Sequence, residues 1–275
     1  MTMLSINTNI GALNASQSSY SVNNSMETSM ARLSSGKRIN SAADDAAGLQ
    51  IARRMDTEIQ GLNQAVRNAA DAQALLQTAE GALDEVHTIL LRIRELSVQA
   101  SNGTYGAQDR LAIQAEVTDL QSEITRISND TTWNSISLIE GSQSTGITFQ
   151  IGADNAQTVT VAIANIALAT LSIGGTSQVT TATNAMSYIA AVDKAISVIS
   201  TNRGTYAAAI NRLDHSVANM QDAATNLAEA KGRITDADFA AETSNLSRTQ
   251  VLQQASMAML AQANAAKQNI LTLIQ

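Results

Sequence analysis

The side chains best suited to catalysis or metal binding are few in this sequence and lie far apart. His87 and His215 are the only histidines, cysteine is absent, and no H-E-x-x-H pattern occurs. A zinc site needs several ligands at short spacing, and neither histidine has a second histidine within helical reach. Because no nucleophile, base and metal constellation can be assembled, the sequence predicts no catalytic residue, no cofactor, no metal site and no enzyme.

The charged residues near the apolar stripes have a structural interpretation instead. Arg203 and Lys231 are the only charged residues in a long apolar heptad pattern, where a buried charge is expected to fix register. Four carboxylates are expected on solvated helix faces: Glu80, Asp84, Glu85 and Glu95.

Composition narrows the class of protein further. The chain has 275 residues, a net charge of −7, 3% aromatic residues, and neither cysteine nor proline. This length allows one large domain or two small ones, and the absence of proline favours long unbroken helices. An acidic chain without a basic block is not expected to bind nucleic acid. It has no run of about eighteen apolar residues and no Sec-type leader, so no membrane span is expected, and export would need another route.

The first two expected helices follow from apolar residues that recur every three or four positions. Residues 1–33 form the first, which Ser34-Ser35-Gly36 should end. A second helix, capped by Ser41 or Asp44, should continue to about Ala100. At 1.5 Å per residue, its length of over fifty residues gives a rod of about 80 Å.

The stripe of the second helix runs from Ala52 through Gln73 to Leu76, where the heptad phase slips, and continues from Ala79 to Ile93. A third helix is expected over residues 107–128. The period then changes to two over residues 147–163, which predicts a β-hairpin.

Residues 164–183 are rich in serine, threonine and glycine, and we expect an exposed loop there. Strict heptad spacing returns over residues 189–234, and a break is expected over residues 234–238. A last helix follows from about Phe239. Its stripe consists of Leu252, Ser256, Met259, Ala263, Ala266, Ile270 and Leu273.

A helix that is apolar on one side needs a partner, because burial of its few large residues does not offset the entropy of ordering it. The order of elements is nearly a palindrome, so the two long helices should fold antiparallel and bring the chain ends together. The N-terminal helix is then the expected partner of the last helix. The apolar surface that remains should bind other molecules.

These observations predict a mainly α fold: a long antiparallel helical rod with a small β-hairpin, plus an N-/C-terminal two-helix coiled coil. The expected terminal coiled-coil domain comprises residues 1–40 and 236–275. The expected rod domain comprises residues 41–235, with the hairpin near 147–163.

Several motifs resemble one family. The run RLSSGKRINSAADDAAGL, from Arg32 to Leu49, resembles the N-terminal signature of bacterial flagellin. The runs LRIRELSVQA from Leu91, SNLSR from Ser244 and AQAN from Ala261 resemble flagellin in the same order. The resemblance covers nearly the whole chain and implies a minimal flagellin, because residues 142–183 leave no room for outer variable domains.

The resemblance implies a structural subunit that polymerises into the helical flagellar filament used for swimming. It also implies export through the flagellar type III apparatus, an extracellular location in the filament, and folding beneath a cap. The implied partners are further copies of the chain, the cap and hook-associated proteins, and an export chaperone at the C-terminal region. The lack of cysteine and proline suits this route, since no disulfide blocks threading and no prolyl isomerisation delays folding.

Three groups of site residues follow. The expected polymerisation residues on the terminal helices are Ile6, Ile10, Leu13, Leu252, Met259, Ala263, Ile270 and Leu273. The resemblance implies an intersubunit connector that contains Arg32, Leu33, Gly36, Arg38, Asp44 and Asp45, the alternative being a solvated turn with a helix cap at Asp44. It also implies a Toll-like receptor contact at Arg92, Leu96 and Glu116, the alternative being an intersubunit contact or an exposed ion-pair face.

Three other functions stay open from sequence alone. A hook–filament junction protein shares the terminal-helix plan but adds few copies to the flagellum. A secreted coiled coil of fixed size would not form open polymers, and an enzyme would need the chemistry that is missing. For the filament subunit, we expect the last helix to become ordered on assembly.

Overall fold

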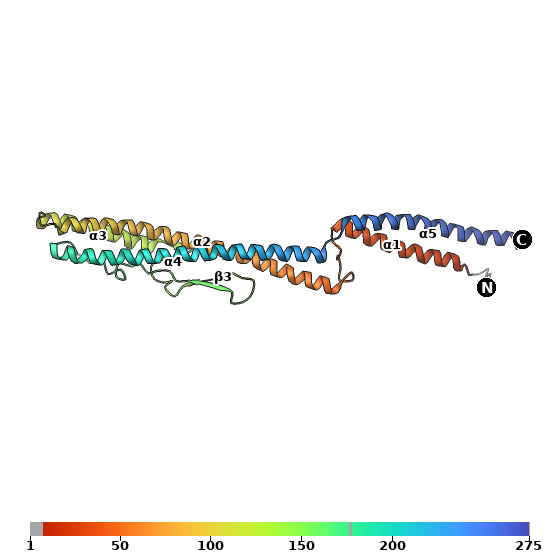
Figure 1. Cartoon of the computed structure of the whole chain (residues 1–275), viewed down its shortest axis with the longest axis horizontal. Helices are drawn as coiled ribbons and strands as arrows, with labels where there is room; N and C mark the ends of the chain where they lie inside the picture. Colours follow the sequence, from red (N-terminus) through yellow and green to blue (C-terminus); the bar gives the residue numbers. More distant parts are fainter. Residues whose placement is uncertain (1–7, 176–177, 275) are drawn as a thin grey trace. The chain divides into compact units, whose positions relative to one another are not determined.

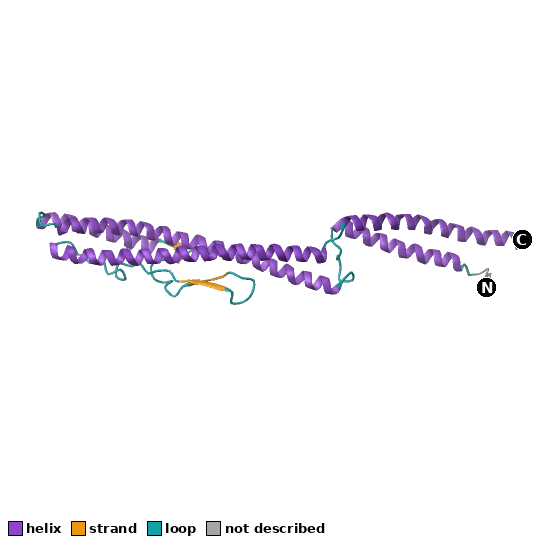
Figure 2. Cartoon of the chain, viewed as in Figure 1, coloured by secondary structure: helices purple, strands orange, loops and turns teal. Residues whose placement is uncertain are grey.

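The computed structural model describes residues 8–175 and 178–274, with side chains described as far as Ala266 in the last helix. Figures 1 and 2 show a mostly helical chain with a small amount of β-strand. In chain order the elements are α1 (Ile10–Ser35), α2 (Ala46–Ser101), α3 (Ala107–Asp130), β1 (Thr132–Trp133), β2 (Ile136–Ser137), β3 (Ile147–Gln150), β4 (Thr158–Val161), α4 (Ala182–Thr235) and α5 (Phe239–Ile274).

The chain forms two compact units, which are described separately below. The terminal unit comprises Met1–Thr57 and Asn226–Gln275, and the rod unit comprises Glu58–Thr225. The domain boundaries expected at residues 40 and 236 therefore fall inside the terminal unit. Polar contacts hold these flanking segments together there: Lys231 pairs with Asp56, and the Arg38 amide donates to the Thr235 carbonyl over 2.7 Å.

Caps set the ends of the first two helices. The Asn9 side chain accepts a hydrogen bond from the Ala12 amide over 3.1 Å, so α1 begins at Ile10 and not at the start of the chain. Gly36 ends α1 as expected, with a left-handed φ of 69°. The cap of α2 is Asp45, which accepts from the Gly48 amide over 2.8 Å, and not Ser41 or Asp44.

Within the rod unit, α2 and α4 run antiparallel in one continuous register. The Gln73 side chain donates to Asp214 of α4 over 2.6 Å, and the Arg94 guanidinium donates to Asp193 over 2.6 Å. The step from Gln73 to Arg94 equals the step from Asp193 to Asp214, so the pairing does not slip between these contacts. Arg203 lies between them in register and pairs with Asp84 over 2.8 Å.

The buried stripe of α2 corrects the expected change of phase. Most of its buried residues follow one heptad pattern: Ala65, Ala69, Ala72, Leu76, Ala79, Leu83, Val86, Leu90, Ile93, Ser97 and Ala100. Leu75 and Leu96 are buried beside this pattern. Ala72 occupies the core position at which Gln73 was expected. Gln73 lies beside the core and bonds to α4, because its amide cannot be buried without a partner.

Four strands form two small antiparallel hairpins. Trp133 pairs with Ile136 between β1 and β2, and Ile147 pairs with Val161 between β3 and β4. The second hairpin confirms the one expected over residues 147–163. Val159 and Val161 of β4 point into the rod core, while the alternate threonines are exposed.

The segment after the hairpin is irregular, as expected, but much of it is buried rather than exposed. Ile166, Ile173 and Val179 have no exposed surface. Two buried glutamines of α3 satisfy its backbone: Gln121 donates to the Ile173 carbonyl over 2.6 Å, and Gln114 accepts from the Val179 amide over 2.8 Å. We call residues 164–175 and 178–181 the strap, because their apolar side chains cover the rod core.

Candidate assembly surface

In the terminal unit, α1 and α5 lie side by side and antiparallel (Figure 1). The Asn9 side chain donates to the Ala263 carbonyl over 3.2 Å, and Gln253 donates to Asn23 over 2.8 Å. The N-terminal helix is therefore the partner of the last helix, as the sequence predicts.

The faces that meet differ from those expected. We define the inner stripe as the buried and half-buried residues that recur in heptads along each helix. They are Ala12, Ala15, Ser19, Val22, Met26, Ser29 and Leu33 in α1, and Glu242, Leu246, Thr249, Gln253, Ser256, Leu260 and Ala263 in α5. Most of them are small or polar, which lets the two backbones approach closely.

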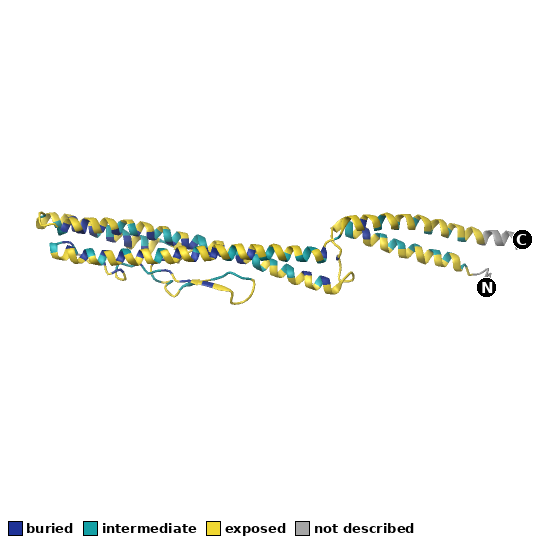
Figure 3. Cartoon of the chain, viewed as in Figure 1, coloured by how far each residue is buried: buried dark blue, intermediate teal, exposed yellow. Residues whose placement is uncertain are grey.

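The large apolar residues of this pair mainly point away from the inner stripe. Leu252 is 46% exposed and Met259 is 65% exposed, although the sequence stripe placed both against the partner helix. That stripe is rotated about the helix relative to the inner one, because Gln253 and Leu260 occupy the buried positions. Figure 3 shows α1 and α5 mostly as exposed surface.

We define the outer surface as the exposed large apolar residues of the terminal helices. They are Ile10, Leu13, Tyr20 and Met30 of α1, and Phe239, Val251, Leu252, Met257 and Met259 of α5. Apolar exposure this dense on a slender helix pair is typical of an interaction site. A groove of about 510 Å³ runs along the pair, with Gly11, Ala15, Leu252 and Met259 among its lining residues.

The expected polymerisation residues are distributed over both surfaces. Ile10 and Leu13 belong to the outer surface together with Leu252 and Met259, whereas Ala263 is half-buried in the inner stripe. Ile6 and the side chains of Ile270 and Leu273 lie outside the described residues. Nothing in a single copy tests the polymerisation role, which stays a prediction.

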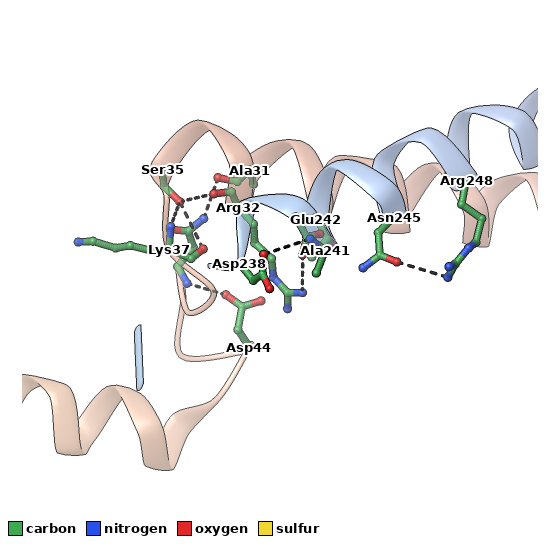
Figure 4. A network of polar contacts seen from close by, with 12 residues as sticks. Ala31, Arg32, Ser35, Lys37, Asp44, Asp238, Ala241, Glu242, Asn245 and Arg248 are labelled. Atoms are coloured by element: carbon green, nitrogen blue, oxygen red, sulfur yellow. Dashed lines mark hydrogen bonds and ion pairs between the residues drawn. The ribbon is translucent and has the colours of Figure 1, made fainter. Parts of the chain in front are cut away.

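The connector between α1 and α2 lies beside the start of α5 (Figure 4) and is hydrogen-bonded to the end of α4. Lys37 and Asp236 form an isolated antiparallel bridge, and the Ala237 amide donates to the Gly36 carbonyl over 3.0 Å. The Arg38 guanidinium donates to the Ile234 carbonyl over 2.7 Å. These contacts join the segment that follows α1 to the segment that precedes α5.

Asp44 folds the connector from within. Its carboxylate accepts from the Ser41 amide over 2.8 Å, from the Asn40 amide over 3.0 Å, and from the Ser41 hydroxyl. These hydrogen bonds, the Ser41 amide first, hold the pKa of Asp44 below its ordinary value of 3.8. Asp44 thus stabilises a loop, while its neighbour Asp45 caps the helix.

Arg32 and Leu33 belong to the last turns of α1 rather than to the connector. Arg32 lies 3.9 Å from Glu242, an inner-stripe carboxylate that is 8% exposed and was not anticipated from the sequence. The one sequence signal that could have placed Glu242 on the inner stripe is the heptad phase of α5. Leu252 and Met259 obscure that signal, because as large apolar residues they suggest a different stripe. No second copy is present, so the intersubunit role of the connector stays a prediction.

The three residues expected at a receptor contact do not share one surface. Arg92 donates two hydrogen bonds to Glu116 across α2 and α3, at 3.0 and 2.8 Å, and also pairs with Glu95. Leu96 is 2% exposed, so it belongs to the rod core and is not available to a receptor. Leu96 is buried because it lies beside the buried heptad positions of α2, and α3 and α4 cover this side of the helix.

Three of the carboxylates expected on solvated faces, Glu80, Asp84 and Glu95, form ion pairs with arginines. Arg203 contacts Glu80 at 3.5 Å as well as Asp84, and Glu95 pairs with Arg92. Arg203 and Lys231 are only partly buried, with about a third of each side chain exposed. They lie at the edge of the helix pair, where they link α2 and α4.

The described part of the chain contains no group of three or more histidine, cysteine or acidic residues that could hold a metal ion. Among the same described residues, no helix has the length and apolar character to span a membrane.

Comparison with known proteins decides the family. The model of the bacterial flagellin N-terminal helical region matches residues 6–144, and that of the C-terminal helical region matches residues 189–274. The chain belongs to the bacterial flagellin family. It is a structural protein of the flagellar filament.

Individual relatives agree over nearly the whole chain. A flagellin of Halalkalibacterium halodurans is 42% identical over 98% of this chain and 99% of its own length, and one of Bacillus subtilis is 39% identical with the same coverage. A crystal structure of Bacillus cereus flagellin has a TM-score of 0.51 and 32% identity, over 60% of this chain and 94% of that one. A putative hook-associated protein of Vibrio parahaemolyticus, with a TM-score of 0.60 over 70% of this chain and all of that one, is only 14% identical and shares the fold alone.

Proposed function

We propose that this chain polymerises into the helical flagellar filament through the outer surface of α1 and α5. The observation that carries this proposal is the exposure of the largest apolar residues of both helices, such as Leu13 at 61% and Met259 at 65%. Small and polar residues of the inner stripe hold the pair together. The outer surface is left for neighbouring copies.

The energetic argument favours assembly over a stable isolated pair. Fully burying one large apolar side chain contributes about 1.5–3 kcal/mol, and ordering each residue of a helix costs about 1–2 kcal/mol. The inner stripe offers few such side chains, so the pair gains most of its burial from further copies. On this account the helical conformation of α5 is weakly populated in the free chain and is stabilised by neighbours.

The proposed subunit leaves the cell unfolded through the type III apparatus and acts outside the cell. Its proposed partners are the cap and hook-associated proteins, and an export chaperone that binds the C-terminal region. Proteins of its family are structural, and we propose no enzyme activity. The connector, with Gly36, Arg38 and Asp44 at its centre, would contact adjacent subunits. Its exposed side chains and its fixed backbone support that role.

A host Toll-like receptor remains a proposed partner, now limited to Arg92 and Glu116. Their ion pair is about half exposed in a single copy. A reporter cell line that carries the receptor should respond to purified monomer, and an Arg92→Ala variant should reduce that response. Silence with folded monomer would remove the receptor from the account.

Truncation tests the proposed assembly. A chain that lacks residues 261–275 should keep the rod unit folded and fail to extend filament seeds, because part of the outer surface and of its pairing helix is missing. Circular dichroism melting of the rod and electron microscopy of seeded reactions measure the two outcomes. Normal filaments from the truncated chain would contradict the proposal, and short capped assemblies from the full chain would favour the junction-protein alternative.

A further inference from the structure

The nine methionines of the chain lie in very different surroundings. Met220 is buried in the rod core, Met26 and Met55 are half-buried, and Met1 and Met3 lie outside the described residues. The remaining four are more than half exposed: Met30, Met186, Met257 and Met259. Oxidation of a thioether follows its exposure, so these four are the most reactive of the methionines that the structure describes.

Met257 and Met259 occupy the middle of α5, where they flank the inner stripe on its two sides. Met257 is 57% exposed and Met259 is 65% exposed. Met259 also lines the 510 Å³ groove beside Leu252, with Ala255 and Ala263 nearby and no charged residue among the lining side chains. The thioether there is open to small polar oxidants.

We propose that Met257 and Met259 form an oxidation site that blocks assembly of the free subunit, with a peroxide as the oxidant. This inference rests on the proposed assembly through the outer surface. A sulfur lone pair attacks one peroxide oxygen, the O–O bond breaks, and a proton moves to the departing oxygen. Sulfur loses two electrons to become the sulfoxide, and the peroxide is reduced to water.

The sulfoxide changes what the outer surface can bury. A flexible apolar side chain becomes a polar one whose oxygen needs a hydrogen-bond donor. The groove beside Met259 is mainly apolar, with Asn14, Ser18, Ser256 and Gln262 as its polar lining residues. A neighbouring copy that covers the sulfoxide with apolar side chains leaves its oxygen without a donor. Oxidised subunits therefore add poorly, while subunits already packed in a filament keep these sulfurs out of reach. Methionine sulfoxide reductase restores the thioether and with it the ability to assemble.

Met186 provides an internal reference for this site. It is 59% exposed, close to Met257 and Met259, but lies in the first turns of α4 in the rod unit and outside the outer surface. Monomer treated with hydrogen peroxide should form sulfoxide at Met186, Met257 and Met259 at similar rates, as peptide mass spectrometry measures. In assembled filaments the rate at Met259 relative to Met186 should fall at least about fivefold. An unchanged ratio would overturn the proposal.

The effect on assembly is tested with leucine variants, which keep size and apolar character. Oxidised wild-type monomer should need about a tenfold higher concentration to extend seeds, which corresponds to about 1.4 kcal/mol. Met30, the other exposed methionine of the outer surface, is replaced by leucine in all the variants compared. In that Met30→Leu background, a Met257→Leu, Met259→Leu double variant should assemble equally well before and after peroxide, whereas Met186→Leu should remain sensitive. Sensitivity of the double variant would overturn the proposal. Failure of unoxidised wild type to assemble would instead contradict the proposed function, so the two failures are distinguishable.

Discussion

Gln253 faces α1 and donates to Asn23 over 2.8 Å, while its neighbour Leu252 is 46% exposed. This one pair of adjacent residues fixes the rotation of α5. A helix that buried its strongest apolar stripe internally would have the opposite arrangement. The terminal unit thus presents apolar residues to its surroundings and keeps polar contacts for itself, which suits a subunit whose core forms only in the polymer.

The rod unit gives a direct test of the buried heptad. Leu90 has no exposed surface, whereas the adjacent Leu91 is 47% exposed. Leu90→Ala should lower the free energy of unfolding of the rod by about 2–5 kcal/mol, because it leaves a cavity in a packed core. Leu91→Ala is the matched control and should change it by no more than about 0.5 kcal/mol. Urea unfolding followed by circular dichroism measures both, and equal losses would contradict the register.

The strap depends on Gln121. This buried side chain donates to the Ile173 carbonyl over 2.6 Å and to the Tyr188 hydroxyl over 2.8 Å. Gln121→Ala should lower the free energy of unfolding by about 1–3 kcal/mol, because two buried acceptors lose a donor. Amide hydrogen exchange in residues 166–175 should become faster. Ser122→Ala, at the exposed neighbouring position, should leave both measurements unchanged. An unaltered exchange rate in the strap of the Gln121 variant would refute its anchoring role.

The connector should respond to acid through Asp44. Hydrogen bonds from the Ser41 and Asn40 amides lower its pKa in the folded chain below 3.8. The stabilisation of the connector by the Asp44 carboxylate is therefore fully present above pH 3.8. It is lost as the pH falls through the lower pKa that Asp44 has in the folded state. The amide proton resonance of Ser41 should titrate with a midpoint below 3.8, and Asp44→Asn should abolish this titration. A midpoint at or above 3.8 would show that these bonds do not favour the carboxylate.

Much of the fold was accessible from sequence because heptad spacing and caps are local signals. The Gly36 stop, the third helix and the hairpin at residues 147–163 were predicted close to their observed positions. The buried strap was missed, because its anchors are two glutamines of α3 that lie far away in sequence. Composition marks such a segment as a loop but carries no information on what covers it.

The assembly surface was accessible only in part, for a physical reason. The apolar stripe of Leu252 and Met259 was identified, but its partner was misassigned, since periodicity shows that a face is apolar and not which molecule covers it. In a polymer the strongest stripe can face another copy. The weaker stripe with Gln253 and Glu242 then faces the chain's own helix.

Matched lysine substitutions test the central claim most directly. Met259 and Met186 are 65% and 59% exposed, so a lysine at either position remains solvated in the monomer. Seeded filament growth, followed by light scattering and electron microscopy, should proceed with Met186→Lys and stop with Met259→Lys, because assembly would bury an unpaired charge only in the second case. Equal growth of both variants would contradict assembly through the outer surface of α1 and α5.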